Sequence, residues 1–311
     1  MQYNDFRLFY NQSIHPELVH LELQRRRLIR LMFVSVLLLL GVVALQLYIG
    51  IFVFTLALLI PVGLWIAYLV FKIQTYFKAF KPRIVALLLD FVDNHINFFF
   101  EKYDNEGKIP KKEFLESRIF TTADDYSGED LIVGKVRETP FKMSELHVKE
   151  FSPARNQLNY VFRGVFLIAD FQRWDMQGKA LMLPDAYRKY LSRSERAFHL
   201  EGGRRVRNHL LPEFEAFFDT YATPDLRLQD VISTDMQRSI LNFRNRFLQQ
   251  NREKEIYVSV IGDKIYLGLT QDRDLMEPNL FVSNVNFESI LEFYEDLSML
   301  LNIVLDIDVM N

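Results

Sequence analysis

An uninterrupted run of uncharged residues, from Leu31 to Phe71, constrains this chain more than any other feature. A helix needs about 20 apolar residues to cross the hydrocarbon core of a membrane, so the run predicts two spans and a tight turn. We expect the spans at about 31–48 and 51–71, with the turn near Gln46, Tyr48 and Gly50. A rival interpretation makes one segment a span and the other a buried core helix, although a core helix need not stay free of charge for so long.

Basic side chains flank this run on both sides and predict its orientation. They are Arg25, Arg26, Arg27 and Arg30 before the run, and Lys72, Lys78, Lys81 and Arg83 after it. Cytoplasmic flanks of membrane helices collect Lys and Arg, so we expect both termini on the cytoplasmic side of a multi-pass protein. A second interpretation of the same side chains is that they bind the headgroups of anionic lipids.

Composition limits the chemistry that is available. The 311 residues carry a net charge of −3, so no general attraction to nucleic acid is expected. The chain has no cysteine, which excludes disulfides, thiolate metal sites and cysteine nucleophiles. No sequence motif for a phosphate-binding loop, a nucleophile elbow or a helical zinc site occurs, so we expect no cofactor and no catalytic residue.

The pattern of hydrophobic residues predicts an α+β protein in four parts. Residues 1–30 form a cytoplasmic helix, most clearly from Pro16 to Arg30, and residues 31–71 form the membrane hairpin. Pro82 is expected to break the second helix. Residues 72–185 then hold an amphipathic helix from Arg83 to Tyr103 and an antiparallel β meander. Residues 204–311 form an α+β subdomain, after a polar stretch between Asp185 and Arg205.

Individual elements of the part that follows the hairpin can also be predicted. The expected helices are Lys111–Glu116, Pro212–Phe217, Thr234–Gln249 and a final helix capped by Asn286. Strands are expected at Leu131–Arg137, Phe141–Lys149, Tyr160–Phe171, Lys179–Leu183, Phe218–Ala222, Glu255–Ile261, Lys264–Thr270 and Ile303–Val309. These short strands with brief connections indicate an antiparallel sheet with packed helices.

The densest acidic cluster is the main candidate for chemistry. Asp124, Asp125, Glu129 and Asp130 fall within seven residues and can in principle hold a divalent cation or act as an acid–base pair. The alternative, which we favour, is a solvated loop between strands, because Asp, Ser and Gly are common in such loops. No histidine lies nearby in the sequence, whereas metal sites usually include one.

Several segments resemble a bacterial family of two-pass membrane proteins that is known only as a domain of unknown function. The similar segments are 117–120, 124–135, 144–146, 162–166 and 214–222. The resemblance implies a protein of the cytoplasmic (inner) membrane with its main domain in the cytoplasm. It supplies no catalytic residue.

Together these features predict a membrane-anchored interaction or scaffold module without a reaction centre. Its expected partners are the lipid bilayer and either another protein or a second copy of the chain. One alternative is a metal-assisted hydrolase that uses the acidic residues of 124–130. Another is a protein that binds anionic lipid.

Overall fold

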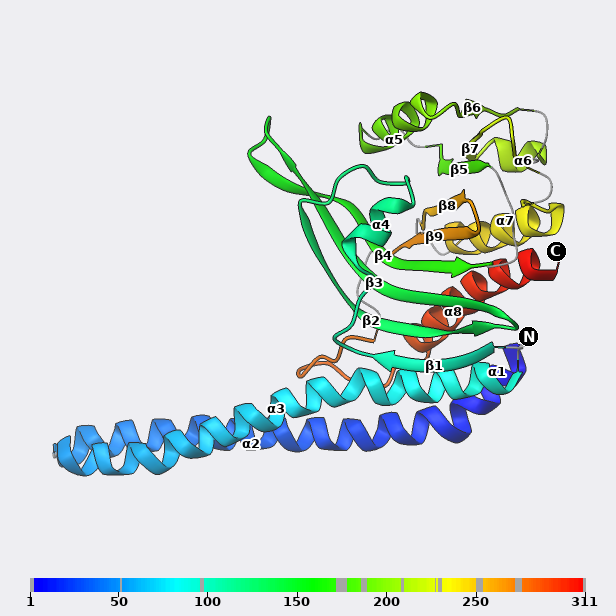
Figure 1. Cartoon of the computed structure of the whole chain (residues 1–311). Coiled ribbons are helices and arrows are strands. Elements are labelled where there is room, and N and C mark those ends of the chain that lie inside the picture. The colour runs from blue at the N-terminus through cyan, green and yellow to red at the C-terminus, as the bar shows by residue number, and fades with distance from the viewer. Residues whose placement is uncertain are drawn as a thin grey trace. The chain divides into compact units, whose positions relative to one another are not determined.

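The computed structural model describes residues 3–50, 52–95, 98–171, 178–185, 189–207, 210–226, 228, 231–249, 254–271 and 276–309. It confirms the α+β class, with long apolar N-terminal helices followed by an antiparallel sheet and packed helices (Figure 1). The chain divides into two compact units. Unit 1 comprises Met1–Phe91 with Leu275–Phe293, and unit 2 comprises Val92–Asp274 with Tyr294–Asn311.

The N-terminal helices of unit 1 are longer than the sequence pattern predicts. Helix α1 (Tyr3–Phe9) continues through a π-helical turn, η1 (Tyr10–Ile14), into α2 (His15–Ile49). The helical segment therefore begins well before Pro16. Buried aromatic contacts explain the extension, because the ring of Phe6 packs on Phe91 and Phe287, with centroids 5.7 and 6.1 Å away.

The turn between the two apolar helices lies where the sequence predicts it. Gly50 adopts a left-handed conformation with φ of 71°, and its N–H donates to the carbonyl of Gln46 at 2.9 Å. Glycine suits this position because it has no Cβ to clash in that region. Helix α3 (Phe52–His95) then runs back alongside α2, as Figure 1 shows.

The prediction that Pro82 ends the second helix is wrong. Helix α3 continues through Pro82 to His95, and strand β1 (Phe98–Asp104) occupies the end of the expected helix Arg83–Tyr103. A proline removes one hydrogen bond from a helix, but here Ile84 and Leu88 are fully buried on either side of the next turn. Their packing offsets that loss. The aromatic residues from Phe98 favour a strand instead.

Unit 2 is built on one nine-stranded sheet within the described part of the chain. The strand order is β1-β2-β3-β4-β9-β8-β5-β7-β6, and every neighbouring pair is antiparallel. The remaining strands are β2 (Asp125–Val136), β3 (Thr139–Ser152), β4 (Gln157–Asp170), β5 (Lys179–Pro184), β6 (Arg204–Arg205), β7 (Phe218–Ala222), β8 (Ile256–Ile261) and β9 (Lys264–Thr270). The expected meander is confirmed for β2, β3 and β4. The expectation that β5 continues it is wrong, because β5 pairs with β7 and β8, and β9 takes the place beside β4.

Short and long helices accompany this sheet. They are α4 (Lys111–Glu116), α5 (Lys189–Leu200), α6 (Pro212–Glu215), α7 (Thr234–Gln249) and α8 (Phe287–Val309). The predicted bounds of α4 and α7 are confirmed, and Asn286 caps α8 by accepting the N–H of Glu288 at 2.9 Å. The strand predicted at Ile303–Val309 is wrong, because α8 continues to Val309. Buried Leu297, Leu300, Leu301 and Val304 follow the helical spacing.

The sheet takes strands from both sides of the polar stretch Asp185–Arg205. Strand β4 pairs with β9, and β5 pairs with β7 and β8. An aromatic core covers one face of the sheet, with Phe114, Phe120, Phe162, Phe166 and Tyr257 in mutual contact and at most 2% exposed. The same core includes Leu146 and Val148 of β3, one of the two strands that carry the acidic cluster described below.

Candidate functional site

Three carboxylates meet where β2 and β3 pair, and they are the candidate site of unit 2. Glu129 lies directly opposite Glu145 in the register of the two strands, and Asp130 follows Glu129. The register slips between Glu129 and Ile132, so Asp130 occupies a β-bulge. Bulges turn side chains away from their usual alternation, and this one brings Asp130 beside the cross-strand Glu pair.

The backbone at this junction is closely packed. A Cβ atom on Gly128 would lie 2.4 Å from the carbonyl oxygen of Glu145, so only glycine fits there. The bulge is held from outside by the turn after β1. The N–H of Asp130 donates to Asn105 at 3.4 Å, and that of Leu131 donates to Gly107 at 3.1 Å. The position of the Asp130 carboxylate is therefore set by main-chain contacts on both sides.

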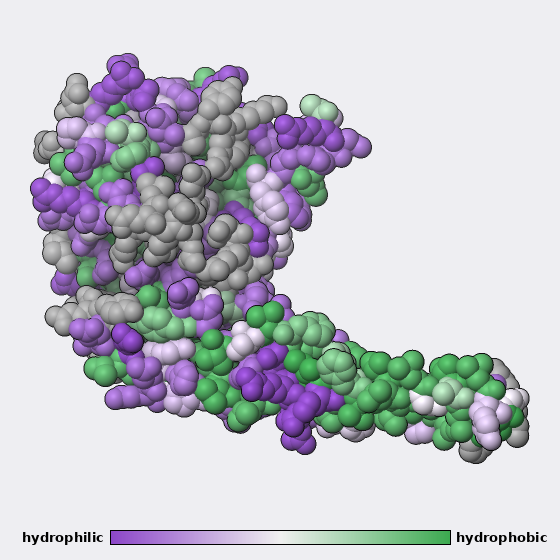
Figure 2. All heavy atoms as spheres, turned by 180° about the vertical axis from the view of Figure 1, so that it is seen from behind, coloured by the Kyte–Doolittle hydropathy of each residue, from purple (hydrophilic) through white to green (hydrophobic). Residues whose placement is uncertain are grey.

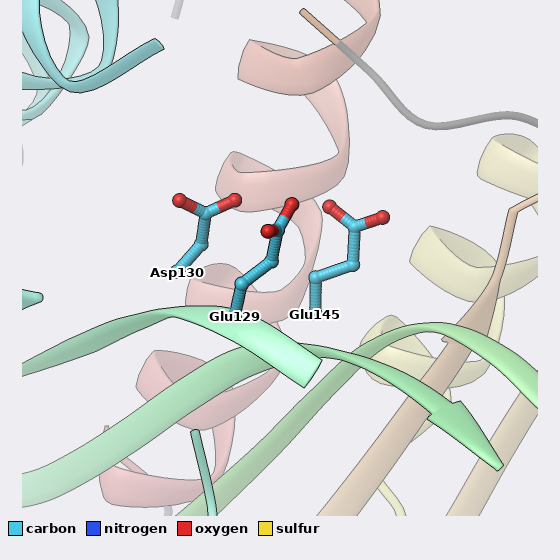
Figure 3. Close-up of side chains that lie close together, drawn as sticks. All are labelled: Glu129, Asp130 and Glu145. Atoms are coloured by element: carbon cyan, nitrogen blue, oxygen red, sulfur yellow. The ribbon is translucent and has the colours of Figure 1, made fainter. Parts of the chain in front are cut away.

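Carboxylate oxygens of Glu129, Asp130 and Glu145 lie within 4.8 Å of one another. Figure 3 shows the three side chains standing side by side on the ribbons of β2 and β3, with their oxygens directed the same way. Asp130 and Glu145 are 7% and 8% exposed, whereas Glu129 is half-buried. Two polar groups border the cluster. The hydroxyl of Tyr103 donates to Asp130 at 2.5 Å, and Nε2 of His147 lies 3.4 Å from Oε1 of Glu145.

This arrangement suits a hard divalent cation. Like charges directly opposite each other destabilise a pair of strands, and a bound cation offsets that repulsion. Calcium and magnesium take carboxylate oxygens as ligands and complete their shells with water. Three acidic oxygens on a rigid backbone supply part of such a shell.

The four acidic residues singled out from the sequence do not all reach this cluster. Glu129 and Asp130 belong to it, but Asp124 accepts the N–H of Phe151 at 2.8 Å, and Asp125 pairs with Lys149 at 3.1 Å. Glu129 is four positions after Asp125, which is roughly 13 Å along a strand. The expected loop is also wrong from Asp125 onward, because these residues form the first half of β2. Pairing with β3 from Lys149 to Glu145 extends the strand.

Sequence reasoning missed Glu145 and His147. Both lie within the strand that was predicted at Phe141–Lys149, and residues two apart in a strand share a face. Glu145 therefore stood on the same face as Met143, which is buried, so a carboxylate interrupted an apolar row. That interruption was the available signal. That Glu145 lies opposite Glu129 of β2 could not be predicted without the register of the two strands.

A second group of predicted site residues, the basic flanks, belongs to unit 1 and divides into two kinds. Arg25 and Lys81 are 6% exposed and are held in ion pairs, Arg25 with Glu22 at 2.6 Å and Lys81 with Glu277 at 3.0 Å. The Arg25 guanidinium, which hydrogen-bonds Glu22, lowers the pKa of that carboxyl to about 2. Arg25 also donates to the carbonyl of Leu280 at 2.5 Å.

The other six flanking cations are exposed: Arg26, Arg27, Arg30, Lys72, Lys78 and Arg83. Arg26 reaches Glu22 at 2.9 Å and Arg83 reaches Glu17 at 3.1 Å. The ammonium of Lys72 lies 5.6 Å from the centre of the Tyr68 ring, within the range of a cation–π contact. These exposed cations stay candidates for setting the membrane orientation or for binding anionic headgroups. Arg25 and Lys81 instead form ion pairs within unit 1.

Comparison with known proteins supports the resemblance stated above. Residues 160–309 match the model of a family described as "Protein of unknown function (DUF3137)". The expected likeness to an uncharacterised family is thereby confirmed. No curated protein matches the chain. Among solved structures, the mycobacterial trehalose monomycolate transport factor A, TtfA, aligns with a TM-score of 0.27 and 7% identity, covering 68% of this chain and 93% of TtfA.

Proposed function

We propose that this chain is a membrane-anchored interaction module of a bacterial cytoplasmic membrane. Helices α2 and α3 cross the bilayer as a hairpin, both termini lie in the cytoplasm, and unit 2 receives a protein partner or a second copy. One observation carries the proposal. We call the parts of α2 and α3 within the charge-free run 31–71 the distal helices. Their apolar side chains point outward, with Phe33, Leu37, Leu47 and Leu64 between 63% and 84% exposed.

This exposure argues against the core-helix interpretation. Both helices are long and apolar enough to cross a membrane, and only 11% and 6% of their most apolar stretches are buried. Figure 2 displays the same property as a continuous hydrophobic surface over the paired helices. Large contiguous apolar surfaces are rare on soluble monomers. In lipid, the same surface needs no further covering.

The exposed cations support the orientation. Arg26, Arg27 and Arg30 precede the apolar run, and Lys72 and Lys78 follow it, so both ends carry the positive charge typical of cytoplasmic flanks. Gly50 and its neighbours carry no charge, as expected for a short turn that has crossed to the other side.

The tip of the β3–β4 hairpin supports an interaction role for unit 2. Phe151 and Leu158 are partners across the two strands and are 44% and 46% exposed, and nearby Tyr160 is 53% exposed. Strand β9 pairs with β4 from Gly164 onward, and the N–H of Gln271 donates to the carbonyl of Arg163 at 2.9 Å. Among the strands described, β4 therefore has an open edge from Gln157 to Phe162. An open edge with apolar side chains is a common docking site for a strand from another protein.

Topology can be tested with two reporter fusions in intact bacteria. Alkaline phosphatase inserted after Gly50 should be active, because it reaches the oxidising side, while green fluorescent protein at the C-terminus should fluoresce in the cytoplasm. The chain should also resist extraction by alkaline carbonate. Release by carbonate would contradict anchoring, and an active phosphatase at the C-terminus would contradict the orientation.

Docking at the hairpin can be tested by site-specific photo-crosslinking. A photoreactive amino acid at Leu158 should give a discrete adduct in cells, whereas the same probe at Leu200, which is 86% exposed on α5, should not. The mass of the adduct distinguishes a second copy from another protein. Equal adducts at both positions, or none at Leu158, would count against the hairpin as the interaction surface.

A second candidate function is cation binding at Glu129, Asp130 and Glu145, as part of a metal-assisted activity. The specific observation in its favour is the approach of three carboxylates to within 4.8 Å. Millimolar Ca²⁺ or Mn²⁺ should then raise the melting temperature of the full chain, and Glu145→Gln should abolish that rise. Asp125→Asn, on the same strand but paired with Lys149, is the matched control and should keep it. No rise in the unaltered protein removes this candidate.

A further inference from the structure

The short loop 279–284, which precedes α8, exposes two apolar side chains to solvent, Phe281 and Val282. Asn279 and Asn284 close its base, because the N–H of Asn279 donates to Oδ1 of Asn284 at 2.8 Å and Nδ2 of Asn284 donates to the carbonyl of Asn279 at 3.0 Å. The Oδ1 atom of Asn279 also accepts the N–H groups of Phe281 and Val282, at 2.8 and 3.2 Å. The loop is therefore a hydrogen-bonded unit with a defined tip.

Three contacts fasten this loop to the long helices of unit 1. Arg25 of α2 donates to the carbonyl of Leu280, and Asn284 donates to the hydroxyl of Tyr76 on α3 at 2.9 Å. Lys81 of α3 pairs with Glu277 just before the loop. The backbone N–H of Asn284 also donates a hydrogen bond to the carboxylate of Glu22, which pairs with Arg25. Charged and polar side chains that are otherwise mostly buried fix the loop against both helices.

The tip of the loop is apolar and exposed in spite of this attachment. Phe281 is 72% exposed and Val282 is 62% exposed, while their neighbour Leu280 is buried at 8%. A loop that is hydrogen-bonded at its base and ion-paired at its side cannot readily fold these two side chains back onto the protein. Their apolar surface therefore stays available for an apolar environment outside the chain.

The attachment points place the loop near the edge of the apolar run. Arg25 precedes Leu31 by six residues and Tyr76 follows Phe71 by five, which at 1.5 Å per residue is roughly 9 and 8 Å along the helices. Lys81 is ten residues beyond Phe71, or roughly 15 Å. From Glu277 to Asn284 the chain thus climbs towards the apolar run, and in Figure 1 the orange segment ahead of α8 lies alongside α3. The headgroup region of a bilayer is about 5–8 Å thick on each side, so the two nearer attachment points lie at about its outer boundary.

We propose that Phe281 and Val282 insert into the cytoplasmic headgroup layer of the bilayer that α2 and α3 cross. This inference rests on the anchoring proposed above. The bilayer is the chosen occupant because the loop is fastened to the same two helices, close to the ends of their apolar surface. Exposed Arg26 is next to Arg25, and exposed Arg30 and Lys72 lie between the attachment points and the apolar run. Basic side chains beside apolar ones suit an anionic lipid surface. The loop then acts as a third, shallow contact that fixes the tilt of unit 1 on the membrane.

Because the chain has no cysteine, a single introduced cysteine gives a unique labelling site. Val282→Cys in the full-length protein is labelled with an environment-sensitive fluorophore and reconstituted into vesicles of phosphatidylcholine and phosphatidylglycerol. Two reference positions are Leu37→Cys, in the apolar run, and Leu200→Cys, on α5 of unit 2, which are 67% and 86% exposed. Quenching by headgroup-level nitroxide lipids and by aqueous iodide is measured at all three.

The proposal expects position 282 to show blue-shifted emission, quenching by nitroxide lipids and loss of iodide quenching, unlike position 200. Iodide quenching at 282 with lipid quenching at 37 overturns the loop insertion and leaves the anchor intact. Shielding of 282 from both quenchers also overturns it, because a protein surface then covers the loop. Iodide quenching at 37 overturns the anchor, and the loop insertion with it. Phe281→Cys repeats the test on the other tip residue if the first label loosens the loop.

Discussion

The two compact units place their large apolar side chains in opposite ways. In unit 2 the large aromatic residues are inside, with Phe114 and Phe166 fully buried. In unit 1 the distal helices carry their apolar side chains outside, and Phe33 is 63% exposed. Both units bury charge. In unit 1, Glu22, Arg25 and Lys81 are each at most 6% exposed, and in unit 2 the paired Lys254 and Asp296 are 7% and 1% exposed.

This contrast teaches that different contacts hold the two units together. Burial of apolar surface is the main driving force for folding in water, and unit 2 follows that rule. In the distal helices of unit 1 the apolar surface faces outward, so its burial does not hold the two helices together. Close packing and polar contacts between the helices have to fix how they pair. The following predictions separate these two regimes.

The largest effect should come from the same substitution placed in each regime. Phe114→Ala removes a ring from the aromatic core of unit 2 and should lower the free energy of unfolding by about 3–5 kcal/mol. Phe33→Ala, on the exposed surface of α2, should change it by less than about 0.5 kcal/mol. Thermal unfolding followed by circular dichroism in mild detergent measures both. A comparable loss for Phe33→Ala would mean that the distal surface is covered by the chain itself.

The second effect tests the buried charge of unit 1. Glu22→Gln leaves Arg25 buried without its carboxylate, and removal of one partner from such a pair costs about 3 kcal/mol or more. Hydrogen exchange at the amides of residues 280–284 should become faster, because Arg25 holds Leu280. The matched control is Glu17→Gln, on the same helix as Glu22, which affects a partly exposed pair with Arg83 of α3. Equal exchange in the two variants would show that Glu22 does not maintain the loop.

Long-range features of unit 1 could be predicted only where they follow from local pattern. The charge-free run and Gly50 located the apolar parts of both helices and their turn, because length and hydropathy are local properties. The continuation through Pro82 depended on burial of Ile84 and Leu88, which the sequence does not show. The hydrogen-bonded loop at Asn279–Asn284 could not be predicted, because its partners Arg25 and Tyr76 are distant in sequence.

The candidate site of unit 2 was predictable to about the same degree. Glu129 and Asp130 were recognised from the density of acidic residues alone. Glu145 and His147 were not, because their approach depends on the β2–β3 register and on the bulge at Asp130. Gly128 permits that register, but a glycine next to acidic residues is equally typical of a loop. The local pattern therefore favoured a loop, and strand pairing overrode it.

The third effect is a pH dependence that arises from Glu22. Its pKa is lowered to about 2, so the stabilisation is fully present above the ordinary pKa of about 4.5 and is lost as the pH falls towards 2. Gln resembles the protonated carboxyl, so the difference in melting temperature between the unaltered protein and Glu22→Gln should be largest near pH 6. It should shrink steadily towards pH 3. A difference that stays constant over this range would contradict the ion pair as its cause.

The smallest effect concerns the contact between the two apolar helices. Trp65 of α3 donates from Nε1 to the hydroxyl of Ser35 on α2 at 2.9 Å, and this hydroxyl also donates to the carbonyl of Leu31. Hydrogen bonds between membrane helices contribute about 0.6 kcal/mol on average, so Trp65→Phe should weaken helix pairing only slightly. Energy transfer between dyes on single cysteines at positions 37 and 64 measures the pairing in vesicles. Ser35→Ala should give an effect of the same size, and the double variant should add nothing further, because both changes remove one hydrogen bond. Separation of the helices by either change would mean that this bond, rather than close packing, holds the hairpin together.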